Sequence, residues 1–224
     1  ANVIERAAGR STFGGDAAKY DWARPRYPDE LYDLLALECG LKAGTRTFEV
    51  GAGTGIATRH LLGRGANPLV AIEPDPRMAA YLVQALPPHA GLNVKVAAFD
   101  EVDLDEGSFD LGVSATAFHW LEQAPALAKA RRLLRGGGWW AMWWNVFGDP
   151  VVLDPFHLAL VKLLETQAPE LLDVGGLPYG LDTAARLADF EKSGRFGAVE
   201  HHVGVARAAQ LGIIATGLLA ACVG

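Results

Sequence analysis

The chain has 224 residues, half of them hydrophobic, and a formal net charge of −6. That length fits one α/β domain with a sizeable core, and the acidic balance argues against a nucleic-acid partner, whose binding surface is normally basic. Cys39 and Cys222 stand far apart without metal-ligand spacing, and no secretory signal pattern is visible, so we expect a cytoplasmic protein. The apolar tail, residues 211–223, is too short for a confident membrane span, so we expect no membrane partner and interpret the tail as a helix that is buried or packed on a partner.

The first 28 residues predict an N-terminal arm. Between residues 11 and 28, glycine, proline, aromatic and arginine residues follow one another without a helical or strand-like period. Residues 29–39 carry an amphipathic pattern, and Gly40 is a natural stop for that helix. The arm is therefore followed by one helix before the first strand.

From residue 46 onwards, apolar runs alternate with helical patterns at short spacing. This alternation predicts an α/β fold, with a Rossmann-like, doubly wound and mostly parallel sheet and helices on both faces. The expected strands are residues 46–50, 69–73, 93–98, 109–114 and 139–146. The expected helices are residues 55–63, 76–86 and 121–134, the last one broken by the glycines at 136–138.

The rhythm changes after Gly148. Residues 154–166 and 183–192 have helical patterns, and a segment rich in glycine and proline, 169–180, separates them. One more strand is expected at 199–205, and no convincing seventh strand follows it. We therefore expect a single domain over residues 1–224, made of an arm or lid (1–28), a cofactor-binding core (29–147), a small helical insertion or cap (148–195), and a C-terminal strand and helix (196–224).

A glycine turn within residues 48–55 is the most informative stretch. An apolar run ends there at Gly51, Gly53 and Gly55, and a helical pattern begins at the next residue. Glycines let the backbone approach a ligand closely, and the helix N-terminus offers N–H groups to polar ligand atoms. Eighteen residues after the last glycine, Glu73 ends the second apolar run, where an acid can accept hydrogen bonds from ribose hydroxyls. The turn therefore predicts a site for a nucleoside-containing cofactor.

Two cofactor classes use such a turn. A dinucleotide fingerprint has the spacing Gly-x-Gly-x-x-Gly, with a pyrophosphate on the helix N-terminus. Here the third glycine, Gly55, comes one residue early, and an acid, Glu49, precedes the turn. The spacing disfavours an NAD-type oxidoreductase, which we keep as the alternative.

Several segments in chain order resemble motifs of the class I S-adenosylmethionine-dependent methyltransferases. They are the turn at 48–55, a second-strand motif at 71–78, a fourth-strand entry at 107–111, and the turn before strand five at 133–138. The arm, together with Phe118-His119-Trp120, is similar to the small-molecule subgroup (methyltransferase type 11) that includes trans-aconitate methyltransferase. The resemblance covers residues 13–146 in order.

This resemblance implies S-adenosyl-L-methionine as cofactor and S-adenosyl-L-homocysteine as product. It implies that Glu49 binds the methionine amino group, directly or through water. Family members often carry an adenine-binding acid where this chain has Ala98, which leaves the Phe99 backbone and the Asp100 side chain as candidates. The candidate cofactor-binding residues are Glu49, Gly51, Ala52, Gly53, Thr54, Gly55, Glu73, Pro74, Met78, Phe99, Asp100, Ser114, Tyr20 and Arg24.

The acceptor side is expected after the fourth strand, at the carboxyl edge where open α/β sheets bind ligands. His119 is the candidate catalytic residue there, and the alternatives are a base, a hydrogen-bond donor or a structural histidine that shapes the pocket. A carboxylate acceptor needs no base. The candidate substrate-binding residues are Phe13, Tyr27, Trp120, Trp144 and Asn145.

We therefore expect a methyltransferase that acts on a small-molecule acceptor, with oxygen as the first choice of atom, by in-line displacement. A non-catalytic S-adenosylmethionine-binding protein is a further alternative. His157, His201 and His202 form no convincing constellation with an acid or cysteine, so we expect no metal. The expected assembly is a monomer or a homodimer.

Overall fold

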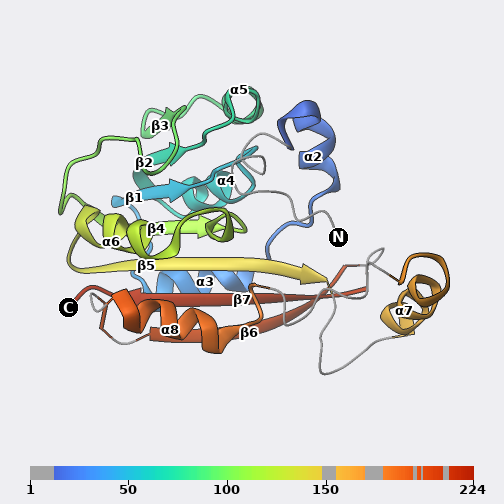
Figure 1. The fold of residues 1–224 in the computed structure, drawn as a ribbon. Coiled ribbons are helices and arrows are strands. Elements are labelled where there is room, and N and C mark those ends of the chain that lie inside the picture. Colours follow the sequence, from blue (N-terminus) through green and yellow to red (C-terminus); the bar gives the residue numbers. More distant parts are fainter. Residues whose placement is uncertain (1–12, 148–154, 170–178, 194–195, 198, 209–211) are drawn as a thin grey trace.

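A computed structural model of the chain describes residues 13–147, 155–169, 179–193, 196–197, 199–208 and 212–224. These residues form a seven-stranded sheet in the order β3-β2-β1-β4-β5-β7-β6 (Figure 1). Strand β7 is antiparallel to its neighbours β5 and β6, and the other pairs are parallel. The strands are β1 (Thr45–Val50), β2 (Ala66–Ile72), β3 (Leu92–Lys95), β4 (Phe109–Ala115), β5 (Leu134–Phe147), β6 (Val199–Ala208) and β7 (Gly212–Cys222). The mostly parallel, doubly wound sheet predicted from the sequence is confirmed.

Helices cover both faces of this sheet (Figure 1). On one face lie α3 (Asp29–Glu38), α4 (Ile56–Gly63) and α5 (Pro76–Ala85), and on the other lie α6 (Gln123–Leu133) and α8 (Thr183–Ser193). Alternate residues of each central strand enter the two cores, because successive side chains of a strand point to opposite faces. The core on the α3 and α4 side includes Leu35, Leu61, Leu111, Ala141 and Trp143. The core on the α6 and α8 side includes Phe48, Leu127, Trp140, Met142, Trp144 and Phe190.

The tail is the main correction to the expected fold. We expected a buried helix and no seventh strand, and the structure instead has β7 there, in a central position between β5 and β6. Leu218 and Ala220 enter one core, and Leu219 and Ala221 enter the other. A strand buried on both faces is a continuous apolar run, which sequence periodicity cannot tell from a buried helix.

The arm also differs from the expectation, since it contains two helical elements. These are a 3₁₀ turn, η1 (Phe13–Asp16), and α2 (Ala17–Ala23). The Asp16 side chain accepts a hydrogen bond from the backbone N–H of Lys19 at 2.9 Å, which caps the start of α2. Two smaller errors concern strand limits: β5 begins at Leu134, so the glycines 136–138 lie within its bounds, and β3 ends at Lys95.

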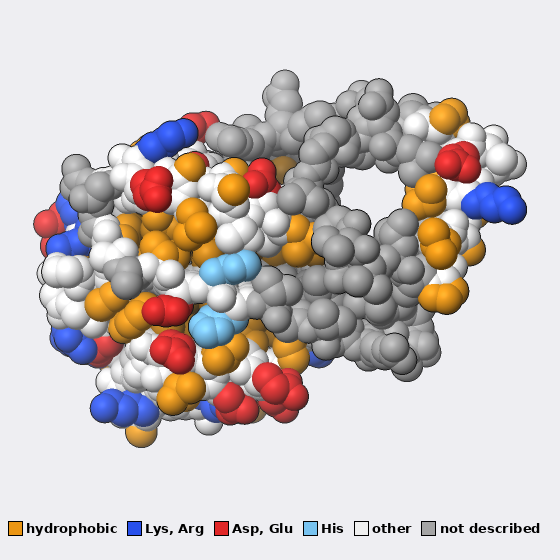
Figure 2. Space-filling model, turned by 90° about the horizontal axis from the view of Figure 1, so that it is seen from below, with side chains coloured by type: hydrophobic (Ala, Val, Ile, Leu, Met, Phe, Trp, Pro, Cys, Tyr) orange, Lys and Arg blue, Asp and Glu red, His pale blue; other side chains and the backbone are white. Residues whose placement is uncertain are grey.

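The segment between β5 and β6 contains the two predicted helices, α7 (Pro155–Gln167) and α8. Most of the segment rich in glycine and proline that separates them, residues 170–178, lies outside the described residues. Figure 2 shows hydrophobic side chains exposed on α7, at the right of the view, and Phe156, Leu158 and Leu163 are each at least half exposed. Among the described residues, none of the helices has the length and apolar content needed to cross a membrane.

Candidate active site at the carboxyl edge of the sheet

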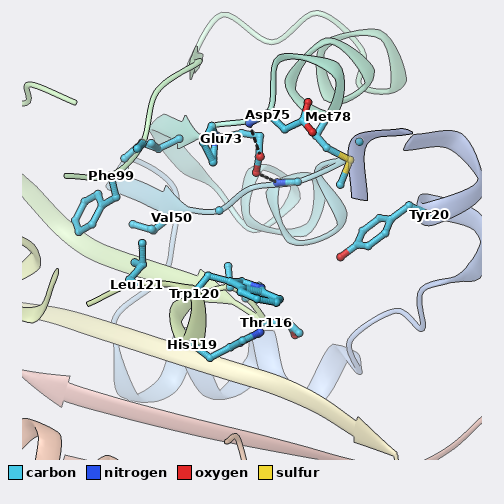
Figure 3. A pocket seen from close by; sticks show the side chains of 18 of the residues that line it. Tyr20, Val50, Glu73, Asp75, Met78, Phe99, Thr116, His119, Trp120 and Leu121 are labelled. Atoms are coloured by element: carbon cyan, nitrogen blue, oxygen red, sulfur yellow. Dashed lines mark hydrogen bonds between the residues drawn. The ribbon is translucent and has the colours of Figure 1, made fainter. Parts of the chain in front are cut away.

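A cavity of about 250 Å³ opens where β1, β2 and β4 end. Because β1 pairs with β2 on one side and β4 on the other, this is the point at which the strand order reverses, the usual ligand site of open α/β sheets. Figure 3 shows side chains from the arm, the strand ends and the segment after β4 pointing into it. Its walls are Gly14, Tyr20, Arg24, Val50, Gly51, Gly53, Ile72, Glu73, Pro74, Asp75, Met78, Ala98, Phe99, Ala115, Thr116, Ala117, His119, Trp120 and Leu121.

The glycine turn forms one wall through Gly51 and Gly53. Their φ angles are +72° and +57°, a conformation that glycine adopts without strain. A Cβ at Gly51 would lie 2.4 Å from the Cβ of Ala117, so this position needs glycine for close approach as well. The other predicted turn residues, Ala52, Thr54 and Gly55, are buried and do not line the cavity. Two positions of the turn therefore present bare backbone to a ligand.

Glu73 lies at the cavity directly after β2, and its side chain is held by backbone groups. Its Oε2 accepts from the N–H of Gly53 at 2.7 Å, and its Oε1 accepts from the N–H of Asp75 at 2.9 Å (Figure 3). Burial raises the pKa of this carboxyl, and the two N–H groups oppose that rise. Each carboxylate oxygen has a second lone pair, so the group can also accept from ligand hydroxyls.

Glu49 and Ser114 lie beneath the turn and do not line the cavity. Thr58 Oγ1 donates to Glu49 Oε2 at 2.6 Å, and the Ser114 hydroxyl donates to the carbonyl oxygen of Val50 at 3.0 Å. Burial raises the pKa of Glu49 to about 8, because removal from water penalises the charged form. The acid predicted to bind the cofactor amino group therefore lies one layer below the cavity wall.

The arm closes another side of the cavity through Tyr20 and Arg24. The Arg24 guanidinium lies 4.9 Å from the centre of the Tyr20 ring. Burial raises the pKa of Tyr20, which therefore keeps its phenolic proton at neutral pH. Both arm residues that were predicted to bind the cofactor line the cavity, and they bring an O–H and a cation to it.

A buried acid that the sequence analysis missed fixes the arm to the turn. Asp21, on α2, accepts from Thr54 Oγ1 at 2.8 Å, from Arg26 Nη2 at 2.8 Å and from Arg59 Nη2 at 3.2 Å. These donors lower the pKa of Asp21 although its burial opposes them. No sequence signal pointed to this cluster, because its members come from α2, the following loop, the turn and α4.

His119 and Trp120 line the side of the cavity opposite Glu73, in a 3₁₀ turn, η2 (Phe118–Trp120) (Figure 3). Trp144 lies behind them on β5, where its Nε1 donates to His119 Nδ1 at 3.2 Å. Burial, followed by the Arg24 charge, lowers the pKa of His119 to about 4, so the ring is neutral at pH 7. Trp144, predicted to bind substrate, does not line the cavity, but it is hydrogen-bonded to His119, which does.

Apolar residues that follow β2 and β3 form another part of the cavity wall. Pro74 and Met78 line the cavity as predicted, together with Ala98 and Phe99. Asp100, one of two candidates for the adenine, is exposed and does not line the cavity, because the chain turns outward there.

The remaining predicted substrate residues lie apart from this cavity. Tyr27 and Asn145 line a small neighbouring pocket, where the Tyr27 hydroxyl bonds to Thr116 Oγ1 at 2.8 Å. Phe13 begins η1, and its side chain lies outside the described part of the structure. In the described ranges, no group of three or more His, Cys, Asp or Glu side chains is arranged to hold a metal ion.

Fold and cavity together define a class: a Rossmann-like domain whose switch-point site combines a glycine turn with an acid at the end of β2. Residues 48–142 match the family described as methyltransferase domain. An uncharacterized methyltransferase of Mycobacterium tuberculosis is 37% identical over 134 residues, which are 60% of this chain and 52% of that protein. Over this segment the chain is therefore similar to methyltransferases, as its motifs predicted.

A further relative and a solved structure are also similar to this chain. The malonyl-[acyl-carrier protein] O-methyltransferase of Geobacter sulfurreducens is 32% identical over 152 residues, which are 66% of this chain and 55% of that protein. A solved structure of Haemonchus contortus phosphoethanolamine N-methyltransferase 2 with S-adenosyl-L-methionine has a TM-score of 0.68 at 15% identity, covering 99% of this chain and 60% of that one. The chain spans about half the length of the curated relatives it matches.

Proposed function

We propose that this chain binds S-adenosyl-L-methionine in the cavity at the carboxyl edge and is an enzyme that transfers the methyl group to an oxygen atom of a small-molecule acceptor. The observation that carries the proposal is the position of Glu73. Its carboxylate lines the cavity at the end of β2 and is fixed there by the N–H of Gly53, a residue of the glycine turn.

The residues around the cavity suit the three parts of this cofactor. Glu73 has lone pairs for ribose hydroxyls. Ala98 and Phe99 supply an apolar surface for the adenine ring. The bare backbone of the turn, together with donors from the arm, suits the carboxylate at the methionine end. The NAD-type alternative stays disfavoured by the spacing, because the third glycine, Gly55, comes one residue earlier than in the dinucleotide fingerprint.

The chain's own residues contribute orientation and exclusion of water. The cofactor, when bound, supplies a methyl group on a positively charged sulfur, which a lone pair of the acceptor can take up in line, leaving S-adenosyl-L-homocysteine. Tyr20 and Arg24 close the cavity from the arm, and Asp21 fixes that arm to the turn. Such alignment and closure account for a large part of the rate in reactions of this kind.

Two observations favour oxygen as the acceptor atom. One is the 32% identity with an O-methyltransferase. The other is the polar character of the acceptor side, where His119 and Arg24 face the cavity and suit an oxygen-rich acceptor. The monomeric or homodimeric state and the cytoplasmic location stay predictions.

The cofactor site is tested by Gly53→Val. This side chain would fill the cavity next to Glu73, so we expect the affinity for S-adenosyl-L-homocysteine to fall at least about 100-fold, or about 2.7 kcal/mol. Isothermal titration calorimetry measures the change, and NAD serves as the ligand of the alternative class.

Gly107→Val is the matched control. Gly107 has a φ of +65°, close to the +57° of Gly53, and lies just before β4, at the other end of the sheet, so both variants carry similar backbone strain. Unchanged affinity in Gly53→Val would overturn the assignment of the cavity, as would a fall of the same size in Gly107→Val.

The acceptor atom is tested separately with cofactor labelled by carbon-13 at the methyl group. A set of small carboxylic acids, alcohols and amines is offered as acceptors, and NMR of the product identifies an O-methyl, N-methyl or C-methyl group by its shift. We expect an O-methyl product. A product methylated at nitrogen or carbon would correct the atom while leaving the cofactor site intact.

A further inference from the structure

The contact between Trp144 and His119 determines which ring nitrogen carries the proton. An indole N–H donates and has no acceptor capacity, whereas a neutral imidazole has one N–H and one lone pair. Because Trp144 Nε1 donates to His119 Nδ1 at 3.2 Å, that nitrogen bears the lone pair. We infer that Trp144 is a positioning residue that holds His119 as the Nε2–H tautomer, so that His119 acts as a hydrogen-bond donor and not as a general base.

Neighbouring tryptophans of β5 show that this hydrogen bond is particular to Trp144. The indole N–H groups of Trp140 and Trp143 are buried, and neither has a hydrogen-bond partner within the described part of the chain. Trp144, only 3% exposed, donates its N–H to His119. A buried N–H without a partner loses about 1–3 kcal/mol, so the Trp144 contact favours one tautomer of His119 over the other.

The surroundings hold the Trp144 indole in one orientation. The backbone N–H of Thr116 donates to the carbonyl oxygen of Trp143 at 2.7 Å, which fixes the chain after β4 against β5. A Cβ at Gly180 would lie 2.6 Å from the Cβ of Trp144, so this glycine packs directly against the indole. The ring of Tyr179 lies 5.1 Å from that of Trp144 and 5.8 Å from that of His119. The two partners are therefore both held by packing.

The positive charge near His119 also favours the neutral imidazole ring. Arg24 lines the same cavity, and its positive charge, after burial, lowers the pKa of the imidazole. A second proton on the ring would lie on Nδ1 and face the N–H of Trp144. The neutral Nε2–H form is therefore the one that this environment accommodates.

The effect of this tautomer on turnover rests on the proposed function. In the Nε2–H tautomer, with Nδ1 engaged by Trp144, His119 has no free lone pair to take a proton from the acceptor. It can instead donate to an acceptor oxygen and orient it. A suitable acceptor therefore presents a nucleophilic oxygen that needs no deprotonation by this residue.

The tautomer is measured directly, without any substrate. Nitrogen-15 NMR of the ligand-free protein assigns the protonated and unprotonated nitrogens of His119, with His119→Gln to identify its signals. We expect the Nε2–H form in the wild-type protein and a mixture of tautomers in Trp144→Phe. Trp143→Phe is the matched control, because it removes an indole N–H without a partner from the same strand, and we expect it to leave the His119 signals in place.

An Nδ1–H signal in the wild-type protein would overturn the inference even if Trp144→Phe fails to fold. So would a tautomer that is the same in Trp144→Phe as in the wild type. Because these results need neither cofactor nor acceptor, they are independent of the outcome for the proposed function.

The role in turnover is tested by comparing two amides at position 119. The amide nitrogen of His119→Gln reaches the place of Nε2 and keeps a donor there, whereas that of His119→Asn reaches only the place of Nδ1. We expect kcat to stay within about tenfold of wild type in His119→Gln and to fall by about 100-fold in His119→Asn, as when a positioned donor is lost. Equal losses in both variants, with cofactor affinity retained, would instead identify a general base.

Discussion

Carboxylates at the two ends of the parallel strands have different hydrogen-bond donors and opposite pKa shifts. At the amino ends, Asp110 of β4 accepts from Arg46 Nη2 at 3.0 Å and from Arg135 Nε at 2.5 Å, and these arginines hold its pKa well below the usual range. At the carboxyl ends, Glu49 and Glu73 are more deeply buried and accept from a hydroxyl and from backbone N–H groups. Burial raises the pKa of both.

This difference separates an acid that is paired with cations from two buried acids that, among the described residues, are not. The charge of Asp110 is already compensated by two cations, so it has little left to offer a ligand. Within the described residues Glu49 and Glu73 form no ion pair, and their donors are a hydroxyl and two backbone N–H groups. Raised pKa values of this kind concentrate at functional sites.

The largest expected effect is the pH dependence of stability caused by Glu49. Its pKa is about 8 in the folded protein and near 4.5 in the unfolded chain. A raised pKa means that the stability it contributes is fully present below the unfolded pKa and is lost as pH rises through the folded pKa. Relative to Glu49→Gln, we therefore expect the free energy of unfolding of the wild type to fall by about 3 kcal/mol from pH 5 to pH 8.

Urea unfolding of both proteins at each pH unit measures this difference. Glutamine keeps the volume of the side chain and an acceptor for Thr58, so the pair isolates the ionisation. A difference that stays constant from pH 5 to pH 8 would contradict the raised pKa and remove the contrast with Asp110.

The next effect is on ligand affinity, through Glu73→Gln. One end of the amide is an NH₂ group, which cannot accept from Gly53 or Asp75, so the side chain would turn or shift. We expect the affinity for S-adenosyl-L-homocysteine to fall about 30-fold, or about 2 kcal/mol, by calorimetry. Retained affinity would show that Glu73, like Asp110, has a structural role and does not bind the cofactor.

Asp110→Asn gives the smallest effect and the opposite pattern. It removes the charge between two half-exposed arginines, so we expect a loss of stability of about 1 kcal/mol and no change in cofactor affinity. Because the pKa of Asp110 is lowered, its contribution is present above the unfolded pKa and is lost as pH falls through the folded one. Thermal unfolding at pH 3 and pH 7 checks this, and a loss of equal size at both would contradict it.

The sequence predicted the alternation of strands and helices along the chain from residue 46 onwards, because short apolar runs bounded by turn residues differ from the helical pattern. The prediction failed where the same apolar pattern fits either a buried helix or a buried strand. Residues 212–222 are apolar except for Thr216, and only the presence of partner strands on both sides makes them β7. Gly14 and Gly15 masked the start of a short helix, whose capping by Asp16 depends on one side-chain contact.

The site was predictable to the extent that it follows from the rule that ligands bind at the carboxyl ends of strands. That rule brought the turn, Glu73 and His119 to one cavity. That rule does not predict which side chains from distant segments form hydrogen bonds with one another. The hydrogen bond from Trp144 to His119 spans 25 residues, and the cluster around Asp21 joins the arm to the turn, so both depend on packing that has no signature in the local sequence.

The central position of β7 has a consequence for synthesis on the ribosome. Strand β6 is made before β7, yet in the finished sheet it is paired through β7 and lies at the edge. When β6 emerges, it therefore has no strand to join, and the tryptophan-rich edge of β5 stays uncovered until residues 212–222 have left the exit tunnel. During that interval the nascent chain presents an open sheet edge, the kind of surface that chaperones shield.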